Sequence, residues 1–175
     1  MQVTIFGGTK PRPGEIEYEN AVQLGRLLAQ SGHTVITGGY MGTMEAVSRG
    51  AKEASGHVIG VTCEEIERWR KSPANAWVIE ERKVATLQER MIALMDAGDV
   101  VIALPGGVGT LAEITLLWNR MIVEAAPKRK LILIGEGWRS TFHTLFQSMN
   151  NYIPATHQSM LSFSATIEEA VKDLE

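Results

Sequence analysis

The stretch Val100–Ile114, VVIALPGGVGTLAEI, determines how this chain is expected to fold. Its first five residues are all apolar, which is typical of a strand buried on both faces of a parallel sheet. Three glycines follow within four positions, at Gly106, Gly107 and Gly109, and a helix is predicted over Thr110–Ala125. The stretch therefore predicts a strand, a tight glycine-rich turn and a helix, in the order that builds an α/β sheet.

The rest of the chain repeats this alternation of short apolar runs and longer helical ones. We expect strands at Gln2–Phe6, His33–Thr37, His57–Val61, Trp77–Ile79, Asp99–Leu104, Lys130–Ile134 and Met160–Phe163. We expect the other helices at Glu15–Ser31, Met44–Ala54, Glu64–Lys71, Arg82–Ala97, Trp138–Met149 and after Thr166. This order predicts an α/β, Rossmann-like, doubly wound and mainly parallel sheet of about six or seven strands, with helices on both faces. The length of 175 residues predicts a single domain over residues 1–175.

Composition and charge narrow the classes of function. A hydrophobic content of 45% with 21% charged residues is typical of an ordinary globular protein. The net charge of −3 and the scattered basic residues do not favour a nucleic-acid partner. The single cysteine, Cys63, cannot form an internal disulfide, and no cysteine or histidine spacing predicts a metal site. We expect core positions for the four tryptophans, Trp69, Trp77, Trp118 and Trp138.

The apolar runs are of strand length, too short to cross a membrane. The first residues predict a strand and lack the features of a signal peptide. We therefore expect a cytoplasmic protein with no membrane partner.

Glycine-rich loops follow three of the predicted strands, at Gly7-Gly8, Gly38-Gly39 and Gly106-Gly107. In a doubly wound sheet such loops open on the edge where ligands bind. Glycine allows close approach of the backbone, and a helix that begins after the loop presents free N–H groups and the positive end of its dipole. These features form an anion site, to which Thr110 adds a hydroxyl donor. One such loop could be only a tight turn, but three predict a phosphate-bearing ligand.

The loop Gly106–Gly109, the glycine loop, can be set against two known phosphate-binding patterns. The P-loop pattern is absent, because no Gly-Lys-Ser/Thr occurs in the chain. The segment Gly107–Ala112 matches the dinucleotide pattern G-x-G-x-x-A, and Glu136 follows the next strand, where an acid could bind a ribose. That pattern normally follows the first strand of a nucleotide-binding unit, whereas here it follows roughly the fifth. A dinucleotide site therefore stays open as a rival hypothesis.

Two charged residues, Glu113 and Arg90, are candidates for chemistry near this loop. Glu113 lies at i+3 from Thr110, so both side chains share a helix face. A carboxylate there suits a sugar next to a bound phosphate, although acids also favour the first turns of any helix. Arg90 lies at the edge of an apolar stripe, where its stem can cover the core and its guanidinium can point toward the strand ends. It could serve the ligand site or form a structural salt bridge, with Glu113 among the candidate acids.

The segment Pro105–Glu113, PGGVGTLAE, resembles the PGGxGTxxE motif of the LOG ("Lonely Guy") family, the cytokinin riboside 5′-monophosphate phosphoribohydrolases and their bacterial relatives. All six fixed positions match, and the resemblance covers roughly residues 2–135. Ile5–Lys10 is similar to the family's first strand and turn, and Tyr18–Ala51 to the segment that follows. The family's Arg-Lys pair reads Arg90-Met91 in this chain.

The resemblance implies hydrolysis of the N-glycosidic bond of an AMP-like nucleoside 5′-monophosphate, without cofactor or metal. It implies a homodimer or a larger homo-oligomer. It assigns catalysis to Glu113, which would act on the ribose, and to Arg90. Binding of phosphate, ribose and base would fall to Gly106, Gly107, Val108, Gly109, Thr110, Gly8, Thr9 and Gly39. Because Met91 replaces a lysine, a carrier or sensor that binds a nucleotide or cofactor without turnover is the alternative, ahead of a dinucleotide-dependent oxidoreductase.

Overall fold

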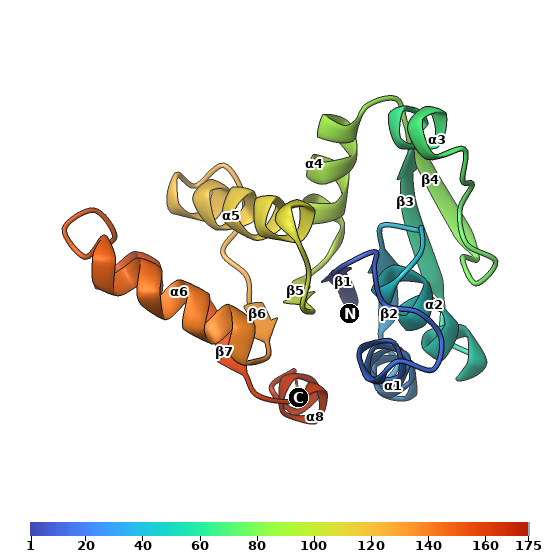
Figure 1. The fold of residues 1–175 in the computed structure, drawn as a ribbon, viewed down its shortest axis with the longest axis horizontal. Coiled ribbons are helices and arrows are strands. Elements are labelled where there is room, and N and C mark those ends of the chain that lie inside the picture. Colours follow the sequence, from blue (N-terminus) through green and yellow to red (C-terminus); the bar gives the residue numbers. More distant parts are fainter. Residues whose placement is uncertain (175) are drawn as a thin grey trace.

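β1 (Gln2–Phe6) and β5 (Val100–Ala103) lie side by side near the middle of a parallel sheet (Figure 1). The computed structural model describes residues 1–174, within which the sheet has seven strands in the order β4-β3-β2-β1-β5-β6-β7. The other strands are β2 (Thr34–Thr37), β3 (Val58–Cys63), β4 (Glu80–Val84), β6 (Leu131–Ile134) and β7 (Leu161–Ser164). Every neighbouring pair is parallel, so the predicted doubly wound α/β sheet is confirmed.

Helices cover both faces of this sheet (Figure 1). One face packs against α1 (Ile16–Gln30), α2 (Thr43–Glu53) and α8 (Ile167–Lys172). The other packs against α4 (Leu87–Ala97), α5 (Val108–Ile122) and α6 (Glu136–Ser148). Two short helices, α3 (Glu64–Arg70) and α7 (Ala155–Gln158), complete the described chain. Among the described residues, no helix has both the length and the apolar character needed to span a bilayer.

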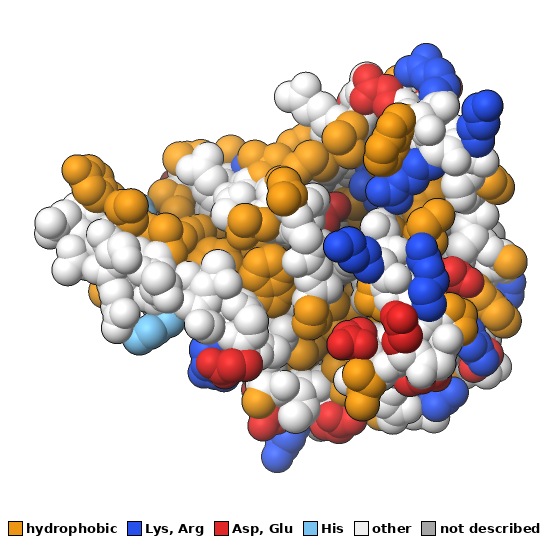
Figure 2. All heavy atoms as spheres, viewed as in Figure 1, with side chains coloured by type: hydrophobic (Ala, Val, Ile, Leu, Met, Phe, Trp, Pro, Cys, Tyr) orange, Lys and Arg blue, Asp and Glu red, His pale blue; other side chains and the backbone are white. Residues whose placement is uncertain are grey.

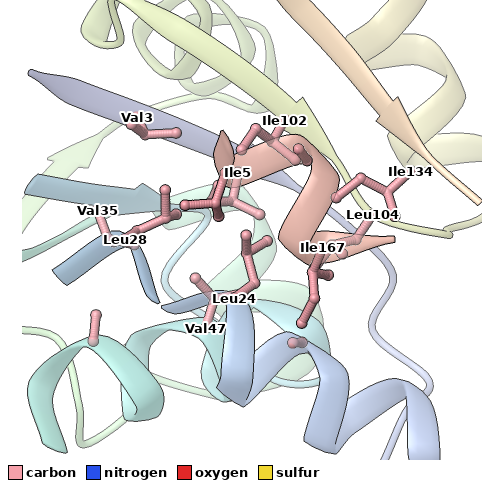
Figure 3. Close-up of a cluster of buried hydrophobic side chains, with 14 of the residues drawn as sticks. Val3, Ile5, Leu24, Leu28, Val35, Val47, Ile102, Leu104, Ile134 and Ile167 are labelled. Atoms are coloured by element: carbon pink, nitrogen blue, oxygen red, sulfur yellow. The ribbon is translucent and has the colours of Figure 1, made fainter. Parts of the chain in front are cut away.

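The alternation of side chains along the strands divides the core into two halves. In β5 and the residue after it, Ile102 and Leu104 pack toward α1 and α8, while Val101 and Ala103 pack toward α5 and α6. Figure 3 shows the first half, where Ile102 and Leu104 lie near Leu24 of α1 and among residues of several strands. Both faces of the central strands are thus buried, which explains why Val100–Leu104 is a continuous apolar run.

The sequence prediction was wrong around β4. Residues 77–79, predicted as a strand, lie in a turn and a bend, and the strand is Glu80–Val84. This strand has the sequence EERKV and pairs only with β3 at the sheet edge, so its side chains are mostly exposed and its apolar content is low. The helix predicted from Arg82 begins instead at Leu87, because Thr86 and Glu89 form a capping box.

The loops that leave β1 and β5 meet at the point where the strand order reverses. From β1 the chain builds β2, β3 and β4 on one side, and from β5 it builds β6 and β7 on the other. The Gly8 N–H donates to the Pro105 carbonyl at 3.3 Å, and the Thr43 N–H donates to the Gly8 carbonyl at 2.9 Å. Three loops predicted to share one edge are therefore joined there, at the position where doubly wound sheets bind ligands.

Candidate active site

A cavity of about 810 Å³ lies beyond the carboxyl ends of β1 and β5. The loop after β1, the glycine loop, the first turn of α5, and parts of α3 and α4 form its walls. In Figure 2 the surface is hollowed between α3 and the start of α5, with hydrophobic and basic side chains around the hollow. The predicted site residues that line the cavity are Gly8, Thr9, Arg90, Gly106, Gly107, Val108, Gly109, Thr110 and Glu113.

Gly39 is the predicted site residue that the structure places elsewhere. It does not line the cavity. Its backbone φ is +74°, its N–H donates to the Thr37 hydroxyl, and its carbonyl accepts from the Asn75 N–H. A Cβ at this position would lie 2.8 Å from the Thr62 Cγ2 atom. Gly39 therefore serves a left-handed turn that packs closely against β3.

The glycine loop ends in an open helix N-terminus. Helix α5 begins at Val108, and its N-cap residue, Gly107, provides no side-chain hydrogen bond to the first turn. The backbone N–H groups of the first turn of a helix have no partner inside the helix. Here Val108, Gly109 and Thr110 belong to that turn and line the cavity. These donors and the helix dipole form a site that suits an anion.

Arg90 and Glu113 meet inside the cavity. Arg90 comes from α4 and Glu113 from the second turn of α5, and the Arg90 Nη1 atom lies 3.9 Å from the Glu113 Oε1 atom. The two side chains are only 6% and 13% exposed. The predicted orientation of Arg90 is confirmed, because its guanidinium lies at the strand ends. The two alternatives for Arg90, a place at the ligand site and a salt bridge, are therefore both met, because its ion-pair partner Glu113 also lines the cavity.

The guanidinium of Arg90 is held on its other sides by the ends of two strands. Its Nε donates to the Val61 carbonyl at 2.8 Å, and its Nη2 donates to the Gly38 carbonyl at 2.9 Å. It also lies 5.3 Å from the centre of the Tyr40 ring. A Cβ on Gly38 would lie 1.9 Å from Nη2, so any larger residue there would displace the guanidinium. With two edges bound to carbonyls, Arg90 presents Nη1 to Glu113.

The ionisation of Glu113 is set by two opposing effects. Burial raises the pKa of the Glu113 carboxyl to about 7, although the nearby Arg90 charge acts to lower it. Burial also lowers the pKa of Arg90, which Glu113 opposes. Near neutral pH the Glu113 carboxyl is therefore present in both protonation states. A group with this property can accept and donate protons at physiological pH.

The stability of the protein is expected to depend on pH through Glu113. Since the folded pKa of about 7 exceeds the usual 4.5, this group favours the folded state most at low pH. Its contribution is lost as pH rises from about 4.5 to about 7, by roughly 3 kcal/mol at 1.36 kcal/mol per pKa unit. Urea unfolding of the wild type and of Glu113→Gln across this range measures the effect. The two free energies of unfolding should diverge as pH rises, and parallel curves would contradict the raised pKa.

Trp69 is a cavity residue that the sequence reasoning missed. It was expected in the core, but it is 76% exposed and lines the cavity with Ile66 and Arg70 of α3. Trp118 and Trp138 are buried, as predicted, and Trp77 is half-buried. The spacing of Ile66 and Trp69, which places both on one face of a helix, was the available signal. Because α3 has no buried residue, that face does not pack into the core.

Glu136 and Met91 are the residues on which the dinucleotide and carrier hypotheses depend. Glu136 begins α6, its side chain is 82% exposed, and it does not line the cavity. The glycine loop and Glu136 thus do not share the single site that a dinucleotide would need. Met91, where the LOG family has lysine, does line the cavity. Within residues 1–174, no cluster of three or more His, Cys, Asp or Glu side chains is placed to hold a metal ion.

The fold is similar to that of proteins that bind a molybdenum cofactor. The molybdenum cofactor binding protein from Rippkaea orientalis matches with a TM-score of 0.77 and 25% identity, over 99% of this chain and 94% of that protein. The molybdenum cofactor carrier protein from Chlamydomonas reinhardtii matches with a TM-score of 0.73 and 23% identity, over 99% and 94% of the two chains. At 23% identity, the similarity to the Chlamydomonas reinhardtii protein concerns the fold alone.

Several relatives of similar sequence are named as phosphoribohydrolases. A probable cytokinin riboside 5′-monophosphate phosphoribohydrolase of Oryza sativa subsp. japonica is 32% identical over 129 residues, 72% of this chain and 56% of the relative. The cytokinin riboside 5′-monophosphate phosphoribohydrolase of Rhodococcoides fascians is 31% identical over 128 residues, 71% and 64% of the two chains. The chain thus spans little more than half the length of the first curated relatives. The model of the SLOG cluster4 family matches residues 1–151, and the chain belongs to this family.

Proposed function

We propose that this protein hydrolyses the N-glycosidic bond of an AMP-like nucleoside 5′-monophosphate and releases the free base and ribose 5-phosphate. The observation that carries the proposal is the buried Arg90–Glu113 pair, which lines the same cavity as the open helix N-terminus of the glycine loop. The relatives named as phosphoribohydrolases of a riboside monophosphate support this choice of reaction.

The 5′-phosphate would bind at the glycine loop. Backbone N–H groups of Gly106–Thr110 and the Thr110 hydroxyl would donate to its oxygens, aided by the positive end of the α5 dipole. Gly8 and Thr9, on the neighbouring loop, would border the ribose. Glu113 lies one helical turn beyond Thr110, which separates the carboxylate from the phosphate and brings it near the sugar.

Glu113 would act on the C1′ atom of the ribose. Cleavage of the glycosidic bond develops positive charge at C1′ and the ring oxygen, and an ionised carboxylate stabilises that charge. The oxygen of a water molecule bonds to C1′ as the bond to the base breaks, and one water proton ends on the departing base, through Glu113 or solvent. A carboxyl with a pKa of about 7 suits such a proton transfer. Arg90 would orient Glu113 and keep part of it ionised.

We also propose that the reaction uses neither a metal ion nor a cofactor. The protein would act in the cytoplasm as a homodimer or a larger homo-oligomer, with no nucleic-acid or membrane partner. The lack of a cofactor and the oligomeric state follow the resemblance to the LOG family. Light scattering during gel filtration measures the oligomeric state directly.

A carrier or sensor that binds a nucleotide or cofactor without turnover is the second candidate. Met91 favours it, because this cavity residue replaces a lysine of the LOG family. The likeness to the molybdenum cofactor binding protein from Rippkaea orientalis also favours it. The two candidates differ in one property, namely whether a bound nucleotide is cleaved.

Chromatography of reaction mixtures separates these candidates. The purified protein is incubated with AMP, GMP, CMP and UMP in turn, and the free bases are quantified. Release of adenine from AMP supports the hydrolase. Binding of AMP with no base released from any of the four would favour the carrier. Binding of NAD(H) without AMP binding would instead favour the oxidoreductase.

Gly106→Ala is expected to weaken AMP binding at least 10-fold, as measured by calorimetry. A Cβ at this position would lie 2.2 Å from the Thr110 Oγ1 atom and 2.6 Å from the Thr110 Cβ atom, so the loop must shift. Gly137→Ala is the matched control, because its Cβ would meet none of the described atoms within 4 Å. Thermal unfolding of both variants checks the fold. Equal AMP affinity in the Gly106 variant and the wild type would contradict the phosphate assignment.

A further inference from the structure

The cavity has two chemically different sides. The glycine loop and the first turn of α5 form a side of backbone donors. Helix α3 and the start of α4 form another side, with the large side chains of Ile66, Trp69, Leu87 and Met91. In Figure 1, α3 lies apart from α5, with α4 between them. A ligand that fills the cavity therefore needs an anionic end and an apolar end.

Trp69 is the largest side chain on the apolar side. It is 76% exposed, and α3 contributes no buried residue to the core, so folding does not explain its presence. The guanidinium of Arg70 lies 4.9 Å from the centre of its ring. This contact steadies the indole and occupies one of its faces, which leaves the other for a flat ligand. Exposed aromatic surface that borders a cavity is typical of a binding site.

The position of the reacting atoms places the base on this apolar side. If the phosphate binds at the glycine loop and Glu113 faces C1′, the base extends from C1′ away from the phosphate. Arg90 lies over the Tyr40 ring and fills the space at the ends of β2 and β3. Among the other walls, the apolar side carries the exposed ring of Trp69, with Met91 beside it on the lining.

We propose that Trp69 is the residue on which the nucleobase stacks, and that it makes the site prefer purine over pyrimidine monophosphates. This inference rests on the proposed function, since it takes the same nucleotide in the same orientation. Stacking on an aromatic side chain stabilises every base, and the larger ring system of a purine gains more contact. Removal of such a platform weakens binding by about 10-fold, within the range measured for base stacking.

The test uses the Glu113→Gln protein as the parent, so that nucleotide binds without turnover. Equilibrium dialysis gives the dissociation constants for AMP and CMP, and tryptophan fluorescence is recorded during the same titrations. We expect Trp69→Ala to weaken AMP binding about 10-fold and CMP binding less, and Trp69→Phe to retain most of the affinity. AMP should quench the parent's fluorescence, and Trp69→Phe should remove most of that change. Trp77→Phe is the control, because Trp77 is half-buried and lies outside the cavity. This variant should keep the fluorescence change on AMP binding.

The outcomes distinguish failure of the stacking role from failure of the proposed function. The stacking role alone would be overturned if the parent binds AMP and Trp69→Ala changes neither the affinity for AMP nor the ratio of AMP to CMP binding. A parent that binds no monophosphate would overturn the proposed function and this inference with it. Because Trp69 is exposed, we expect the variants to keep the parent's unfolding temperature, which calorimetry checks.

Discussion

Glu113→Gln is expected to reduce adenine release from AMP by about 10²–10⁴-fold while AMP binding persists. Glutamine keeps the size of the side chain but can neither stabilise a cationic C1′ by charge nor take up a proton. The phosphate site on the first turn of α5 stays intact, because Glu113 lies outside that turn. Steady-state rates from quantified adenine and dissociation constants from calorimetry separate the two effects.

The matched control for this prediction is Glu136→Gln. Glu136 is also an acid near the start of a helix that follows a buried strand, but its side chain is exposed and lies outside the cavity. Its replacement should leave the rate within about twofold of wild type. If Glu113→Gln retained the wild-type rate, or if Glu136→Gln abolished it, the assignment of Glu113 would be contradicted.

Arg90→Met is expected to lower both the free energy of unfolding and the rate of base release. The change leaves the Val61 and Gly38 carbonyls without their donor, at about 1–3 kcal/mol for each buried group. A total loss of about 2–6 kcal/mol follows for the two groups, which overlaps the range of about 3–5 kcal/mol seen when a buried charge pair is broken. Without the Arg90 charge, the pKa of Glu113 should rise further, so less of its carboxyl is ionised at neutral pH.

Arg82→Met is the control for loss of an arginine. Arg82 pairs with Glu80 on the edge strand, with both side chains more than two-fifths exposed, and such surface pairs contribute about 0–1 kcal/mol. Urea unfolding should therefore distinguish the two variants clearly. A similar small loss of stability in both variants, or a fully active Arg90→Met protein, would show that the buried guanidinium has neither role.

The sequence was most informative where the local pattern and the tertiary environment agree. β1 was predicted with the bounds that the structure has, and the apolar run before Pro105 forms a strand buried on both faces. Arg90 could be identified because helical periodicity placed it beside the apolar stripe of α4. Its contact with Glu113 is one of the alternatives that the sequence predicts. The two carbonyls that hold it come from β3 and the loop after β2, which no local pattern relates to α4.

The errors have a common physical origin in features set by tertiary contacts. β4 has a charged sequence because it lies at a sheet edge, so its hydrophobicity did not mark it as a strand. Gly39 was expected to line the cavity because it belongs to a glycine-rich loop, but its positive φ serves the turn against β3. Trp69 was expected in the core because tryptophan usually is, whereas short α3 keeps it at the cavity.

The most direct test of glycosidic cleavage is the simultaneous quantification of adenine and ribose 5-phosphate in one mixture of AMP and wild-type protein. We predict that the two products appear in equal amounts and at equal rates, and that both fall by about 10²–10⁴-fold when Glu113→Gln replaces the wild type over the same interval. AMP that binds to the wild-type protein but remains intact, with no adenine and no ribose 5-phosphate formed, would contradict hydrolysis.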